Sequence, residues 1–191
     1  MFKTISIASL LAFAAGPALA HVDPLAHGSV AAGFTHPIFG PDHVLAMVAV
    51  GLWAAMLGGR AIWAVPAAFV GAMAFGFLLS LAAMPLPMVE PMILTSVIIM
   101  GVLVALAIRL PMAAGMALVA ALALFHGHAH GTEMGGAGAL AYLAGFASAT
   151  TLLHGTGLIL GLTLARIAQG VALRGFGGTV AALGTALFAF G

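Results

Sequence analysis

Long apolar runs fill most of the chain, separated by short breaks that contain glycine, proline and the rare charged residues. A membrane-spanning helix needs about 20 apolar residues, and beyond the first 20 positions the pattern predicts six segments near that length. These segments are expected near Asp42–Leu57, Ala61–Ala83, Pro91–Ile108, Pro111–Phe125, Gly138–Ala165 and Val171–Phe190. The expected fold is all-α: a polytopic membrane helix bundle with six transmembrane helices.

Composition supports lipid as the main solvent. Of the 191 residues, 64% are hydrophobic and only 5% are charged, and the mean hydropathy is +1.26, values that water-soluble domains do not sustain. The chain has no cysteine, so any metal site must use imidazole, carboxylate, thioether or backbone oxygen ligands. A net charge of +1 without a basic run excludes nucleic acid as a partner. No phosphate-binding glycine loop is present, so no ATPase subunit is evident.

The first 20 residues have the parts of a secretory signal peptide. A lysine precedes a short apolar stretch, and the small residues Ala18 and Ala20 mark a cleavage site. We expect residues 1–20 to be removed, which leaves residues 21–191 as one six-helix transmembrane domain that begins at His21. An uncleaved first helix is the alternative, although the apolar run is short for a span.

Charge asymmetry predicts how the bundle sits in the membrane. If the mature N-terminus is periplasmic, every basic residue of the mature chain is cytoplasmic, as the positive-inside rule requires; these residues are Arg60, Arg109, Arg166 and Arg174. The bacterial inner membrane is the expected location, with both mature termini periplasmic. The outer side then holds every histidine except His154, together with the acidic residues Asp23, Asp42, Glu90 and Glu133.

The first polar cluster lies where the first mature helix begins, around His36, Asp42 and His43. An ionisable side chain at membrane depth costs about 2.5–3.5 kcal/mol on insertion scales and needs a partner or a function. Pro37 and Pro41, with a glycine between them, predict a broken or hinged start to this helix. Asp42 has a simpler alternative role as a carboxylate at the positive end of the helix dipole.

The second cluster follows the fourth apolar segment and contains three histidines and an acid within eight residues. If helical geometry continues, His126, His130 and Glu133 share one face at i, i+4 and i+7, whereas His128 points the opposite way. Two imidazoles one turn apart, followed by a carboxylate, are typical of metal chelation. A polar loop exposed to water is the alternative.

Two further ionisable residues leave their roles open. Glu90 stands between prolines at the start of the third segment, where it is either a site residue or an exposed acid at a helix N-terminus. His154 lies well inside the fifth segment, as either a deep relay or ligand position or a histidine hydrogen-bonded to a neighbouring helix.

Both clusters resemble signatures of the HupE/UreJ family of nickel and cobalt permeases. His36 followed by Asp42-His43, with Met47 and the run Val50-Gly51-Leu52-Trp53-Ala54 behind them, is similar to that family's first-helix motif. The stretch Phe125-His126-Gly127-x-Ala129-His130-Gly131-x-Glu133 resembles its fourth-helix motif. The resemblance implies nickel or cobalt uptake across the inner membrane for hydrogenase or urease maturation. The positions that it carries over are His36, Asp42, His43, His130 and Glu133, with His128 at a variable position.

The chemistry of the ligands is compatible with that implication. Imidazole and carboxylate ligands suit nickel, cobalt and zinc and disfavour magnesium and calcium. We expect the divalent metal ion to be the substrate, with no prosthetic group. The predicted metal-binding residues are His21, His36, Asp42, His43, Glu90, His126, His130 and Glu133.

Two features of this binding follow from the ligand type. Ligation requires neutral imidazole, so uptake is expected to fall as the pH drops through the histidine range near about 6.5. An intramembrane zinc-dependent hydrolase, or a periplasm-facing metal sensor or assembly factor, would use similar residues, and these are the alternative functions.

Overall fold

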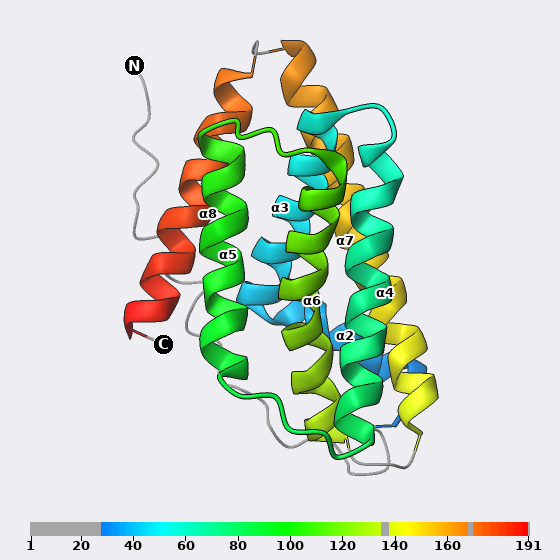
Figure 1. Cartoon of the computed structure of the whole chain (residues 1–191). Coiled ribbons are helices and arrows are strands. Elements are labelled where there is room, and N and C mark those ends of the chain that lie inside the picture. The colour runs from blue at the N-terminus through cyan, green and yellow to red at the C-terminus, as the bar shows by residue number, and fades with distance from the viewer. Residues whose placement is uncertain (1–27, 135–137, 168–169, 191) are drawn as a thin grey trace, which may run out of the picture.

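The computed structural model describes residues 28–134, 138–167 and 170–190 as a bundle of long, roughly antiparallel helices (Figure 1). Every regular element within these ranges is a helix, which confirms the all-α prediction. The helices are α2 (Val30–Phe39), α3 (Pro41–Leu57), α4 (Ala61–Leu81), α5 (Val89–Ala105), α6 (Met112–Met134), α7 (Ala139–Ile167) and α8 (Val171–Phe190). His21 and the predicted signal peptide lie outside the described residues.

The described helices agree with a membrane protein. Four of them, α4, α6, α7 and α8, are long and apolar enough to cross a membrane, and α2 with α3 makes a fifth span if the bent pair is counted as one. Helix α5 is apolar but has only 17 residues, at the lower limit for a span. The number of six spans therefore stays a prediction.

The start of the first span is broken, as its prolines and glycine predict. Helices α2 and α3 meet at an angle of 85°, and Gly40 between them has an extended backbone. Pro41 occupies the first turn of α3, where its missing N–H breaks no helical hydrogen bond. The sequence pattern did not predict that the residues before this break form a helix. Ser29 caps α2 by accepting a hydrogen bond from the amide of Ala32 at 3.0 Å.

Helix α6 corrects one predicted boundary. The fourth apolar segment was expected to end at Phe125, but the helix continues to Met134. The reason is that packing against neighbouring helices overrides the low helix propensity of histidine, glycine and threonine. The second histidine cluster is therefore held on a helix and is not a loop.

Close helix contacts at glycines bring the helices together. Helix α4 packs mainly on α6, α5 on α8, and both α2 and α3 on α7. A Cβ at Gly127 of α6 would overlap the backbone of Met73 in α4, and one at Gly51 of α3 would overlap the backbone of His154 in α7. Small residues at such contacts are typical of membrane helix packing.

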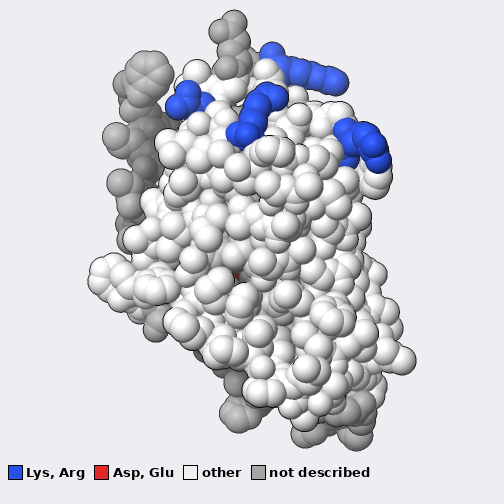
Figure 2. Space-filling model, viewed as in Figure 1, with Lys and Arg blue, Asp and Glu red and all other residues white. Residues whose placement is uncertain are grey.

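The two ends of the bundle differ in charge. Figure 2 shows the arginines gathered at one end of the bundle, which we call the arginine end. It consists of the helix ends and connections that carry Arg60, Arg109, Arg166 and Arg174. The opposite end, where α6 finishes and α7 begins, is the histidine end (Figure 1). This separation places the two polar motifs far from every described arginine.

Candidate metal site

Two histidines from distant parts of the chain meet inside the bundle. His43, in the first turns of α3, and His130, in the last turns of α6, are both buried, and their Nε2 atoms lie 2.6 Å apart. Two imidazole nitrogens that bind one ion at about 2.1 Å each, at a right angle, lie about 3 Å apart. A small separation of the two rings would therefore admit a cation between them.

The carboxylate of Asp42 sets the protonation of this pair. Its Oδ2 lies 2.8 Å from Nδ1 of His43, so the negative charge favours a proton on Nδ1 and leaves the lone pair of Nε2 facing His130. In the absence of a cation, Nε2 of His130 must then be the donor of the short contact. A carboxylate behind a histidine ligand is a common way to orient the ring and raise its basicity. The Asp42 side chain retains 22% of its exposure.

His126 lies one turn before His130 on α6, and its ring is 5.0 Å from that of His43, edge to face. Its Nε2 lies 2.9 Å from Oγ of Ser96 in α5. Because the Ser96 hydroxyl donates to the carbonyl of Ile93 at 2.6 Å, the serine oxygen is left to accept, so Nε2 of His126 is the donor. The lone pair of His126 is therefore on Nδ1, which is buried without a hydrogen-bond partner among the described residues.

His36 covers the pair from the side of α2. Its ring centroid lies 4.4 Å from that of His130 and 6.1 Å from that of His43, and the residue itself is exposed. Phe146 of α7 is fully buried and packs its ring 4.5 Å from that of His130 on another side. The cluster thus has an exposed imidazole on one flank and an apolar wall on another.

Three predicted site residues are not brought into this cluster by the described contacts. Glu90 lies in the first turn of α5 and is exposed, and within the described part of the chain it has no ion pair. The backbone of α6 includes position 133, but the Glu133 side chain is not among those described, and neither is His21. Within the described ranges, no group of three or more His, Asp or Glu side chains is already arranged to hold a metal ion. The part of the candidate site that is already assembled is the pair of side chains His43 and His130.

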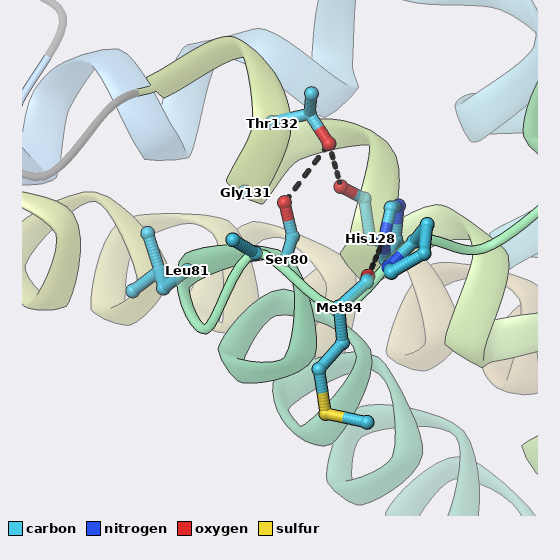
Figure 3. A pocket seen from close by; sticks show the side chains of 8 residues that line it. Ser80, Leu81, Met84, His128, Gly131 and Thr132 are labelled. Atoms are coloured by element: carbon cyan, nitrogen blue, oxygen red, sulfur yellow. Dashed lines mark hydrogen bonds between the residues drawn. The ribbon is translucent and has the colours of Figure 1, made fainter.

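His128 faces away from the cluster, as its spacing predicts. Figure 3 shows its ring beside the turn that follows α4, where Nε2 lies 2.8 Å from the carbonyl oxygen of Met84. The neighbouring Thr132 shares a hydrogen bond of 2.9 Å with Ser80. These residues line an open hollow of about 480 Å³ at the histidine end. His128 therefore connects α6 to the α4–α5 turn, and does not contact His43 or His130 within the described structure.

Sequence reasoning missed Ser96 and Phe146, which position the histidine rings. Ser96 was detectable in principle, since it is one of very few polar residues in the apolar stretch that forms α5. Phe146 gives no signal at all, because one phenylalanine in an apolar helix looks like any other. Contacts between helices decide both roles.

The fold and the cluster together define a class: a helical membrane protein with a buried histidine–carboxylate cluster between its helices. The chain belongs to the HupE/UreJ family, because the family model described as HupE / UreJ protein matches residues 9–187. Protein HupE of Rhizobium leguminosarum bv. viciae is 44% identical over an alignment of 191 residues. The alignment covers 97% of this chain and 98% of that protein. No solved structure matches the chain significantly. The predicted membership of this family is thereby confirmed.

Proposed function

We propose that this protein is a permease that carries a divalent transition metal, nickel first and cobalt second, inward across the bacterial inner membrane. The observation that carries the proposal is the convergence of His43 and His130, backed by Asp42, inside an apolar bundle. A buried ionisable cluster in a membrane protein is costly and is typical of an ion pathway. Membership of the HupE/UreJ family supports metal supply to hydrogenase or urease maturation as the purpose of the transport.

The site has the properties that transport needs. Imidazole nitrogens select transition metals over magnesium and calcium, which prefer oxygen ligands. Two preformed nitrogens leave most coordination positions to water or to side chains that join on binding, so the ion is held without being trapped. His36 is the nearest exposed candidate to join the pair, and Glu90, His126, Glu133 and the predicted N-terminal His21 remain proposed contributors.

The arrangement of charge supports the direction. With the arginine end in the cytoplasm, the positive-inside rule is satisfied by all four described arginines, and the histidine end faces the periplasm. An interior-negative potential then favours inward movement of a dication by about 4.6 kcal/mol per 100 mV. Downhill movement through the protein therefore needs no nucleotide.

Nickel uptake into sealed proteoliposomes tests the proposal, and two neighbouring histidines of α6 provide matched variants. We expect saturable uptake of radioactive nickel that excess cobalt inhibits and magnesium does not. His130→Gln removes one converging nitrogen and should lower the initial rate at least about tenfold. His128→Gln is the same substitution two residues away, on a side chain that contacts Met84 instead, and should retain most of the rate.

Two results would contradict the permease. Wild-type vesicles that bind nickel but never accumulate it would support a metal sensor or assembly factor instead. Equal loss in both glutamine variants would show that α6 tolerates no change, and would remove the support for a site at His130.

A further inference from the structure

Among the described histidines, His154 lies deepest in the bundle. Helix α7 begins at Ala139 at the histidine end, and at a rise of 1.5 Å per residue His154 lies about 22 Å along it. His126 lies only about 12 Å from the end of α6 at Met134. His154 is therefore near the middle of the bundle, well below the pair His43–His130.

Packing alone does not account for a histidine at this position. His154 is 1% exposed, and neither ring nitrogen has a hydrogen-bond partner among the described residues. A buried polar group without a partner costs about 1–3 kcal/mol, whereas an apolar side chain of similar size costs nothing of this kind. Of the two roles left open by the sequence, hydrogen bonding to a neighbouring helix is not found in the described structure.

The position of Phe69 connects His154 to the cluster above it. The ring of this buried α4 residue lies 5.0 Å from that of His154, edge to face, and 5.7 Å from that of His126. The ring of Phe69 thus lies next to both imidazoles. Since Ser96 occupies Nε2 of His126, the unpartnered nitrogens of the two imidazoles beside Phe69 are Nδ1 of His126 and both nitrogens of His154.

Other polar atoms lie about one helical turn nearer the histidine end. Thr150, one turn before His154 on α7, is fully buried, and its hydroxyl contacts the thioether sulfur of Met73 at 3.6 Å. Met73 lies one turn after Phe69 on α4. Imidazole is a common ligand of nickel, and a thioether sulfur can bind softer transition-metal ions.

We propose that His154 is a second, deeper metal-binding residue, which takes the ion from His126. This inference rests on the proposed transport function and adds an intermediate stage to it. The exchange needs only a lone pair on one ring nitrogen of neutral His154 and release of the ion by His126. The ion keeps its charge and its remaining ligands, so the step requires no further reactant.

The test separates binding at the outer cluster, stability and flux. His154→Leu replaces the imidazole by an apolar side chain of similar size. We expect the metal-free protein to melt at the same or a higher temperature, because an unsatisfied polar group is removed. Nickel binding by the outer cluster should keep its Kd, while the initial rate of uptake into vesicles falls at least tenfold. Thr156→Val, an exposed change two residues along α7, should leave all three quantities unchanged.

A second variant and a second assay distinguish a metal ligand from other roles. His154→Gln keeps a polar side chain but is a poor nickel ligand, so it should lose uptake as His154→Leu does; normal uptake in the glutamine variant would overturn the proposal. Exchange of labelled for unlabelled nickel at equal pH on both sides needs no net proton movement. A metal ligand is required for that exchange, whereas a proton carrier is not. Nickel exchange at the wild-type rate in His154→Leu would therefore also overturn the proposal.

Failure of this inference differs from failure of the proposed function. If wild-type vesicles accumulate nickel and His154→Leu vesicles do so equally, only the deeper stage is wrong. If wild-type vesicles accumulate none, the permease is wrong and the deeper stage with it.

Discussion

The half of the bundle at the histidine end and the half at the arginine end have opposite interiors. Buried polar side chains within the described residues are His43, Ser96, His126, His128, His130, Thr150 and His154, all between the histidine end and the middle. The other half is filled by apolar side chains and by Trp53, whose indole Nε1 donates to the carbonyl of Ile108 at 2.9 Å. Among the described residues, the buried polar side chains are thus concentrated where an ion would bind, and the indole N–H of Trp53 in the other half is already hydrogen-bonded.

This difference indicates a protein closed on the arginine side. A dication cannot cross a dry apolar interior without ligands, since the desolvation of a buried charge is far too costly. In the proposed transport, release at the arginine end would require a rearrangement that lets water or ligands reach the ion beyond His154. The histidine half would then provide the affinity, and the arginine half would provide the seal.

The largest expected effect comes from the charge behind the site. Asp42→Asn removes the negative charge next to Nδ1 of His43, so both the favoured tautomer and the basicity of the ligand nitrogen are lost. Nickel affinity should fall about 10–100-fold, as is usual when such a partner of a metal-bound histidine is replaced. Equilibrium dialysis of the purified protein measures the Kd. Asp42→Glu, which keeps the charge, should retain more affinity, and an unchanged Kd in Asp42→Asn would remove the carboxylate from the site.

Matched glycine substitutions in the two halves should separate stability from binding. A Cβ at Gly127, between His126 and His128, would overlap the backbone of Met73, and one at Gly177 of α8 would overlap that of Ala105. Each change to alanine should lower the free energy of unfolding by about 1–3 kcal/mol through overpacking. Unfolding in detergent measures this loss.

Only Gly127→Ala should also weaken nickel binding, because it moves the α6 segment that carries His126 and His130. Gly177→Ala lies in the arginine half and should keep the wild-type Kd. Equal effects of the two variants on the Kd would mean that the halves are not independent.

The sequence predicted the broad architecture and the two motifs, but not how they meet. The break at Gly40 and the opposite directions of His128 and His130 follow from local rules of proline geometry and helical spacing. The 2.6 Å contact between His43 and His130 joins residues 87 positions apart, and no local rule predicts which helices become neighbours. The separation of Glu90 from the described cluster has the same origin, since its side chain direction depends on where α5 packs.

The smallest expected effect tests the seal. Trp53→Phe removes the indole N–H and leaves the carbonyl of Ile108 without its partner, which should lower the free energy of unfolding by about 1 kcal/mol. Trp63→Phe is the same substitution on the exposed side of α4, where Trp63 is 59% exposed. The Arg60 guanidinium lies over its ring. The loss of stability should therefore be smaller still. Because Trp53 lies in the arginine half, neither variant should change the nickel Kd. A tenfold change in the nickel Kd for Trp53→Phe would show instead that the seal and the binding site move together. The bundle would then be one coupled unit and not an affinity half and a sealing half.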